Sequence, residues 1–201
     1  MTKHHPKDIT LAEYAAGTLD EGRSLVVTEH LHRCMHCRRA VAGFEQVGGV
    51  MLEAIKPVEM SAGARDAVLG RLSDAQPIAL RRKTLKDYSL GPWRWIGPGL
   101  RARAVGLPED NGARVFMLKA MPGTELPKHN HNGTELTCVL SGAFLHEGGR
   151  YDLGDCDDAD EDDVHSPVIN GDEECVCLVA IQGNIVFQSL LGRIIQPFVR
   201  L

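Results

Sequence analysis

The chain has few of the features that place a protein in a membrane or on nucleic acid. Aromatic residues make up only 5% of its 201 residues, which is too few for the stacking platforms of single-strand binders. Its formal net charge of −5 lacks the basic excess of a direct DNA reader. No apolar run approaches the roughly 20 residues of a membrane span, and the opening residues lack the apolar stretch of a signal peptide. We therefore expect a soluble, cytoplasmic protein with no direct nucleic-acid or membrane partner.

Six cysteines in a reducing compartment favour metal or redox chemistry over disulfides. His30, Cys34 and Cys37 form the motif H-x3-C-x2-C. On a helix His30 and Cys34 share a face, and the C-x2-C spacing lets a turn point both sulfur atoms at one ion. A closed tetrahedral zinc site needs a fourth ligand, for which His4 and His5 are the candidates. A chance C-x2-C beside unrelated histidines is the alternative.

The first third of the chain has a helical pattern. Gly17 is expected to end a first helix and Pro57 a third. Capping boxes are predicted to begin at Thr10 and Thr18. The residues Ser61–Leu72 predict a fourth, amphipathic helix. Four helices with so few large apolar residues form a thin core, which bound zinc would stabilise.

From about residue 87 onward, short apolar runs alternate with turn-forming residues, as is typical of an all-β sandwich or barrel. The expected strands are Arg101–Val105, Ala113–Ala120, Glu135–Ser141, Cys175–Ile181 and Asn184–Ser189. The sequence thus predicts an α+β chain of two domains. A small zinc-stabilised helical bundle occupies residues 1–74, a linker residues 75–86, and an all-β domain residues 87–201.

The β half carries a second motif with harder ligands. Gly123, His129, His131, Glu135 and Gly142 stand as G-x5-H-x-H-x3-E-x6-G, which matches the first cupin motif at every fixed position. His129 and His131 are two residues apart, so they lie on the same face of a strand. The motif therefore predicts a cupin barrel with a metal site inside it.

The second cupin motif is altered, although its ligand is retained. Gly154 and His165 keep the expected spacing, whereas Asp160 and Asp162 replace the proline and glycine of the turn. The predicted cupin ligands are His129, His131, Glu135 and His165. This set of three nitrogens and one oxygen accepts Zn, Fe, Mn or Ni. A barrel whose histidines bind no metal is the alternative.

Two features outside these motifs each allow two interpretations. Seven of the nine residues in Asp155–Asp163 are acidic, which predicts a solvated loop or a charged rim that repels anions and collects cations. Cys175 and Cys177 share one face of a strand, which favours core packing over an oxidant-responsive pair. Cys138 and Cys156 suggest no role.

The order of these features resembles the ChrR-type zinc-binding anti-sigma factors, in which a zinc anti-sigma domain precedes a cupin-like domain. The paired histidines at positions 4 and 5, the segment Ala15–Leu19, the H-x3-C-x2-C motif and the C-x-C pair carry the resemblance. The zinc ligands that it implies are His5, His30, Cys34 and Cys37, with His4 still open in place of His5. The resemblance further implies that the chain withholds an extracytoplasmic-function sigma factor from RNA polymerase. Singlet oxygen or a related oxidant would act through the cupin domain.

We therefore predict a transcription regulator, with zinc in the N-terminal site and Zn, Fe, Mn or Ni in the cupin site. The alternative is a metal-dependent, dioxygenase-like cupin enzyme whose helical domain mediates oligomerisation. A third hypothesis is a redox-sensitive zinc protein in which oxidation of Cys34 and Cys37 ejects the metal. Because cupins commonly dimerise, a homodimer through the cupin domain stays open.

Overall fold

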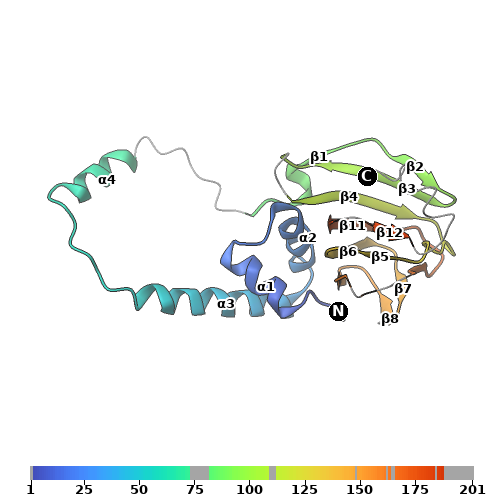
Figure 1. Ribbon diagram of the computed structural model, residues 1–201, viewed down its shortest axis with the longest axis horizontal. Helices are drawn as coiled ribbons and strands as arrows, with labels where there is room; N and C mark the ends of the chain where they lie inside the picture. The colour runs from blue at the N-terminus through green and yellow to red at the C-terminus, as the bar shows by residue number, and fades with distance from the viewer. Residues whose placement is uncertain are drawn as a thin grey trace.

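The computed structural model describes residues 2–72, 82–108, 112–147, 149–161, 163, 166–183 and 185–187, with backbone alone for residue 131 and residues 185–187. Helices occupy one end of the molecule and strands the other (Figure 1). The predicted α+β organisation is confirmed. Among the described residues, no helix has the length and hydropathy needed to cross a membrane.

The helical part of the described chain contains α1 (Asp8–Ala16), α2 (Glu21–Leu31), α3 (Met35–Glu53) and α4 (Ala64–Leu72). Gly17 ends α1 as predicted, with a left-handed φ of 74° that glycine adopts without steric cost. The third helix ends at Glu53, before Pro57, and the fourth begins at Ala64 rather than at Ser61.

Both predicted capping boxes are wrong. Helix α1 starts at Asp8, after Lys7, and no side chain caps it. The hydroxyl of Thr10 lies inside this helix and donates to Asp158 Oδ2 at 2.8 Å. Helix α2 is capped by Asp20, whose carboxylate accepts the N–H of residue 23 at 2.9 Å. Thr10 is thus bonded to a residue distant in the chain. Asp20, a better local acceptor, takes the capping position expected for Thr18.

The strands form three antiparallel sheets in the described chain. The seven-stranded sheet has the order β1-β3-β4-β11-β6-β9, with β2 paired to β3; the other sheets are β10-β7-β8 and β12-β5. The large sheet consists of β1 (Ser89–Leu90), β2 (Arg94–Gly97), β3 (Leu100–Gly106), β4 (Ala113–Ala120), β6 (Glu135–Ser141), β9 (Cys156–Ala159) and β11 (Cys175–Gln182). The smaller sheets consist of β5 (His129–His131), β7 (Phe144–His146), β8 (Gly149–Tyr151), β10 (Val168–Ile169) and β12 (Ile185–Phe187). The predicted limits of β4 and β6 are confirmed.

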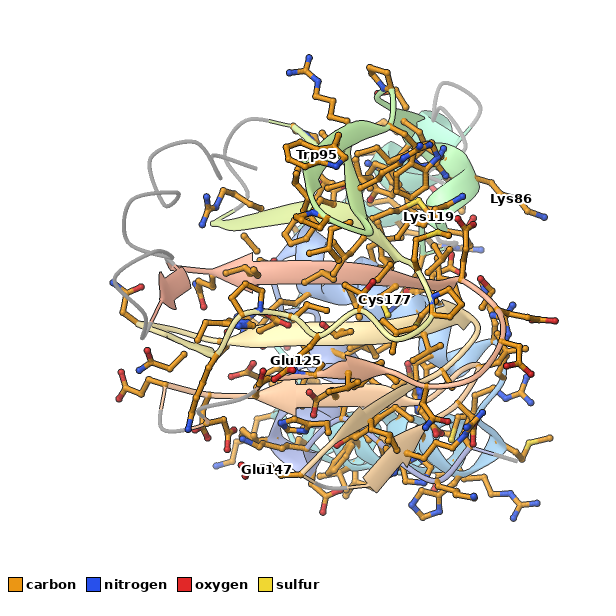
Figure 2. The ribbon with its side chains drawn as sticks, turned by 90° about the vertical axis from the view of Figure 1, so that its right-hand side faces the viewer. Lys86, Trp95, Lys119, Glu125, Glu147 and Cys177 are labelled. Carbon is orange, nitrogen blue, oxygen red and sulfur yellow. The ribbon has the colours of Figure 1, made fainter. Side chains whose placement is uncertain are left out.

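The central strands of the large sheet, β4, β6 and β11, are buried on both faces. Side chains alternate along β11, so that Leu178 and Ala180 face α2 while Cys177, Val179 and Ile181 face the interior of the cupin sandwich. Figure 2 looks toward the sandwich and shows Cys177 near the middle of the sheet. One strand therefore contributes to two separate cores.

Helix α2 packs directly on strands β4, β6 and β11 of the large sheet. Leu25, Val26 and Val27 are consecutive, yet each is at most 1% exposed. A helix buried all round must be covered on opposite sides, and here α1 and α3 cover one side while the sheet covers the other (Figure 1). The core of the helical domain thus continues into the outer face of the cupin sheet. The thin core that composition predicted is completed by the neighbouring domain.

The acidic segment Asp155–Asp163 differs from the predicted solvated loop, because part of it is a strand. Its residues Cys156–Ala159 form β9, paired with β6. Asp155 is only 1% exposed. Its carboxylate accepts main-chain N–H groups from Lys3 at 2.7 Å and from Asp152 at 2.9 Å. Periodicity in a charge-rich run does not reveal such long-range partners.

Part of the expected linker packs on the helices. Residues 73–81 lie outside the described residues. Arg82 lies over the ring of Tyr14 at 3.9 Å and donates to its carbonyl at 2.6 Å. The short 3₁₀ helix η1 (Leu85–Asp87) begins with an N–H that donates to Glu29 Oε1 at 2.8 Å. Residues 82–87 therefore fasten the start of the cupin domain to α1 and α2.

Candidate metal centre

Four side chains from three segments meet where α2 ends and α3 begins. His5 comes from the arm that precedes α1, His30 from the last turn of α2, and Cys34 and Cys37 from the start of α3. Their candidate ligand atoms all lie within 4.8 Å of one another. The structure thus brings together the four residues that the resemblance had implied.

The spacing of these atoms fits a tetrahedral zinc ion. His5 Nδ1 lies 3.3 Å from Cys34 Sγ and 3.4 Å from Cys37 Sγ. Zinc bonds of about 2.1 Å to nitrogen and about 2.3 Å to sulfur give tetrahedral edges of about 3.6 Å. Among the described residues, the buried Nε2 of His30 has no hydrogen-bond partner, which a bound metal ion would supply. The donor set is therefore suited to zinc.

Hydrogen bonds orient the ligands on both sides of the cluster. His30 Nδ1 lies 2.7 Å from the carbonyl oxygen of Gly154, so Nδ1 carries the proton and Nε2 has its lone pair available. The sulfur of Cys34 accepts the N–H of Cys37 at 3.4 Å. Cys34 is the N-cap residue of α3 and Cys37 lies in its first turn, where the helix dipole favours negative charge.

The electrostatic surroundings keep the metal-free histidines neutral and the thiol protonated. Burial lowers the pKa of His30 to about 4 and, together with His36, lowers the pKa of His5. Burial and the adjacent Cys34 raise the pKa of the Cys37 thiol to about 12. Neutral imidazole is the form that binds metal, whereas the thiols must release their protons when zinc binds.

His4 occupies a different place from His5. Its ring stacks on Tyr151 at a centroid distance of 3.9 Å, and its Nε2 lies 3.2 Å from the carbonyl oxygen of Arg150. His5, not His4, is the arm histidine in the cluster. The choice between them that spacing left open is decided by these contacts.

The predicted cupin site is described only in part. His129 is 6% exposed, and its Nδ1 lies 2.6 Å from the carbonyl oxygen of Pro127, which makes Nε2 the nitrogen suited to a metal. His131 lies on β5, with no description of its side chain, and His165 lies outside the described residues. Within the described side chains, His129 and Glu135 belong to no group of three or more potential ligands. The cupin metal site therefore stays a prediction.

The surroundings of Glu135 disfavour its negative charge, which a bound cation would stabilise. Burial raises its pKa to about 7, with Asp157 adding to the shift. The hydroxyl of Thr137 donates to Oε1 at 2.9 Å. The pKa of His129 is lowered by burial and by the nearby His146. The imidazole of His129 and the carboxylate of Glu135 are thus both poorly solvated.

Comparisons with known proteins match both parts of this arrangement. The family described as "ChrR Cupin-like domain" matches residues 82–183. The anti-sigma-E factor ChrR of Cereibacter sphaeroides is 38% identical over 213 aligned residues, which cover 99% of each chain. This chain belongs to the ChrR family. Its curated relative is a regulator rather than an enzyme.

A solved structure of the ChrR family extends the comparison to three dimensions. The crystal structure of Rhodobacter sphaeroides SigE in complex with the anti-sigma ChrR matches with a TM-score of 0.75 and 37% identity. The match covers 90% of this chain and 99% of that chain. The order of helices and cupin strands is therefore shared with a protein solved while bound to a sigma factor.

The remaining cysteines of this ChrR-family chain form two neighbouring pairs. Cys175 and Cys177 face the sandwich interior, with sulfur atoms 3.7 Å apart. Cys138 lies directly opposite Cys156 in the pairing of β6 with β9, on the face that meets α2. All four are buried. Core packing, the default interpretation of the C-x-C pair, agrees with this burial.

Sequence reasoning missed the residues that support the metal cluster from the cupin domain. Gly154 accepts from His30, and Asp155 accepts from the arm that carries His5. The acidic composition of this segment had concealed Asp155. The sequence marks Gly154 only as a glycine of the second cupin motif, and its φ of 88°, which glycine adopts without strain, becomes visible only in the structure.

Proposed function

We propose that this chain is a cytoplasmic anti-sigma factor that withholds an extracytoplasmic-function sigma factor from RNA polymerase. The full-length relationship to ChrR supports this proposal, because a relative described as an anti-sigma-E factor covers both domains. The matching complex contains a sigma factor bound to the relative. The proposal also explains why two domains with different metal chemistry share one chain.

The observation that carries the proposal is an apolar surface on α3, α4 and the segment between them. Figure 1 shows α3 running away from the rest of the molecule and α4 standing apart from it. The exposed apolar side chains of this surface are Val47, Val50, Met51, Leu52, Ile55, Val58, Met60, Val68, Leu69 and Leu72. None of the residues of α4 is buried. Exposed apolar patches of this extent mark protein interaction sites, and we propose that a sigma factor covers this one.

The metal cluster supports this surface from its base. Cys34 is the N-cap residue of α3 and Cys37 lies in its first turn, while His30 lies in the last turn of α2. Zinc coordinated by these residues and His5 would link the two helices. The direction in which α3 leaves the molecule would then depend on the cluster. A chain without zinc should present the α3 and α4 surface in many orientations and bind its partner weakly.

We propose that the cupin domain is the sensor. Singlet oxygen or a related oxidant would change its predicted ligands or thiols, among them the buried His129 and Cys177 and Glu135 on β6, and thereby favour the sigma-free arrangement. Such a release requires that the signal change the relative stability of two states. We also propose that the cupin site binds Zn, Fe, Mn or Ni.

The proposed domain limits are residues 1–74 for the helical domain, 75–86 for the linker and 87–201 for the cupin domain.

The experiment that tests the proposal is capture of a sigma factor by the tagged full chain from its native host, with zinc measured on the same preparation. The full chain is needed because the helices share their core with the cupin sheet. Recovery of a sigma factor by a preparation that carries zinc supports the proposal. A folded, zinc-loaded chain that captures no sigma factor would exclude it.

A further inference from the structure

The N-terminal arm, residues 2–7, brings His5 to the metal cluster, and its anchor is a buried carboxylate of the cupin domain. The main-chain N–H groups of Lys3 and His4 donate to Asp155 Oδ1 at 2.7 and 3.3 Å. A carboxylate that is 1% exposed is tolerated only when hydrogen bonds satisfy it. The arm and Asp155 therefore hold each other in place.

Side chains of the arm also contact the same segment of the cupin domain. The ring of His4 stacks on Tyr151 with an interplanar angle of 18°. The N–H of Lys7 donates to Asp158 at 2.8 Å, and its ammonium group lies 2.7 Å from Asp160. The partners of the arm in the cupin domain thus fall within residues 150–160, on β8, on β9, in the turn between them and directly after β9.

The second histidine of the cluster depends on this segment as well. His30 Nδ1 lies 2.7 Å from the carbonyl oxygen of Gly154, the neighbour of Asp155. Cys34 and Cys37 differ, because α3 itself positions both, and the N–H of Cys37 donates to the sulfur of Cys34. The two thiolate ligands are placed locally, whereas both imidazole ligands are oriented by the cupin domain.

The same segment extends into the cupin interior. Tyr151 stacks on Phe144 at 4.8 Å and belongs to the interior core, and its hydroxyl donates to Asp157 at 3.2 Å. Strand β9 pairs with β6 so that Ala159 lies opposite Glu135, a predicted cupin ligand. Residues 150–160 therefore contact the metal cluster at one side and the cupin interior at the other.

We propose that Tyr151, Gly154 and Asp155 of the segment 150–160 are positioning residues for the zinc cluster, with Asp155 as the central one. Zinc affinity at the N-terminal site is then a property of both domains, and a change in the cupin interior that displaces this segment weakens the two imidazole ligands. The inference rests on the zinc site proposed above. It does not depend on the sigma factor.

The first test compares two isosteric variants of the full chain, Asp155→Asn and Asp152→Asn. Asparagine at position 155 has one acceptor oxygen in place of two, so its NH2 group must face either the N–H donors of the arm or the N–H of Asp152. The Asp152 variant changes charge in the same turn, at a half-exposed carboxylate that pairs with Arg150. Zinc affinity is measured by competition with a chromogenic chelator. Loss of a supporting residue typically lowers metal affinity about 10-fold or more, which we expect for Asp155→Asn, with no change for Asp152→Asn.

A second variant and a second readout protect the test from a folding defect. His4→Ala removes the stack on Tyr151 at the protein surface, and we expect zinc affinity to fall about 2- to 10-fold. Cobalt is then substituted for zinc in each variant. Loosened imidazole ligands should leave the thiolate-to-cobalt absorption in place and weaken the bands of tetrahedral cobalt. Folded variants with unchanged affinity and unchanged cobalt spectra would overturn the proposal.

Reciprocal coupling supplies the last test, because linkage between two sites acts in both directions. Added zinc should slow backbone amide exchange in residues 150–160 of the full chain. The His5→Ala chain, which retains the cupin residues, controls for zinc bound in the sandwich and should lose the effect. Equal protection in both chains would contradict the coupling. Sigma capture by the unaltered chain is scored separately, so that failure of the anti-sigma function and failure of this inference are told apart.

Discussion

Gly22 of α2 lies so close to Val115 of β4 that a Cβ built on the glycine would sit 2.7 Å from Val115 Cγ2. The absence of a side chain thus sets how closely the helical domain approaches the cupin sheet. Gly22→Ala should reduce the free energy of unfolding by about 1–3 kcal/mol, the usual effect of overpacking. This loss exceeds the helix-propensity gain of at most about 1 kcal/mol.

The control for this substitution is Gly43→Ala in α3, where the added Cβ would meet nothing within 4 Å. That change should stabilise the chain by up to about 1 kcal/mol, through helix propensity alone. Urea unfolding of the full chain at one fixed zinc concentration measures both effects. A Gly22→Ala chain as stable as the Gly43→Ala chain would mean that the domains do not pack as described.

Substitution of a cluster ligand should remove one zinc ion per chain and abolish sigma binding. Cys37→Ala leaves three ligands, and the closed four-coordinate site is lost. His32→Ala is the matched control, since His32 is half-exposed and pairs with Glu29 at 3.4 Å. Zinc is counted by elemental analysis and sigma binding by capture. Full zinc content in the Cys37 variant would remove that residue from the ligand set.

Zinc binding should strengthen as pH rises. Burial raises the pKa of the Cys37 thiol to about 12 in the metal-free chain, so this thiol is protonated at neutral pH. Zinc must displace its proton, and affinity therefore increases about tenfold per pH unit for each proton released. Chelator competition at pH 6, 7 and 8 gives the slope. A slope of zero would show that the metal-free cysteines are already ionised.

A polar substitution on α4 should weaken sigma binding without affecting the fold. Leu69→Ser alters a side chain that is 49% exposed, so stability should change by less than about 0.5 kcal/mol. Loss of an apolar interface residue should reduce affinity about tenfold. Trp95→Ser is the control, because Trp95 is 71% exposed on the cupin side of the molecule (Figure 2). Equal affinities of the two variants would place the sigma surface elsewhere.

Replacement of a cupin ligand should separate inhibition from release. Glu135→Gln preserves shape while removing the negative charge, so the chain should still inhibit its sigma factor. Release by singlet oxygen from an illuminated photosensitiser should be reduced. Glu147→Gln, at an exposed carboxylate (Figure 2), should respond normally. If the Glu135 variant released its sigma factor without any oxidant, the assignment of the cupin domain as the sensor would be contradicted.

Local patterns predicted the elements well where a short stretch of chain decides the outcome. The strands β4 and β6 have the predicted limits, because alternation of apolar side chains depends on adjacent residues. Gly17 ends α1 for the same reason. The capping boxes at Thr10 and Thr18 failed because a cap competes with other partners, and Asp158 lies 148 positions from Thr10 in the chain.

Three ligands of the candidate zinc cluster were predictable from the sequence, whereas the cupin-domain residues that contact the cluster were not. Spacing alone placed His30, Cys34 and Cys37 together, since they lie within three turns of two joined helices. The choice of His5 over His4 came from the resemblance, and the structure accounts for it by stacking His4 on Tyr151. The predicted cupin ligand His165 lies outside the described residues, so that part of the prediction stays open.

The sequence by itself determined a helical part followed by a β part, and the local grouping of His30, Cys34 and Cys37, because periodicity and motif spacing act over a few turns or strands. Only the tertiary structure decided that the helices and the large sheet share a core, and that Gly154 and Asp155 contact His30 and the arm that carries His5. These contacts join residues more than 120 positions apart. Their formation depends on how α2 packs on the sheet, and no local pattern in the chain records that packing.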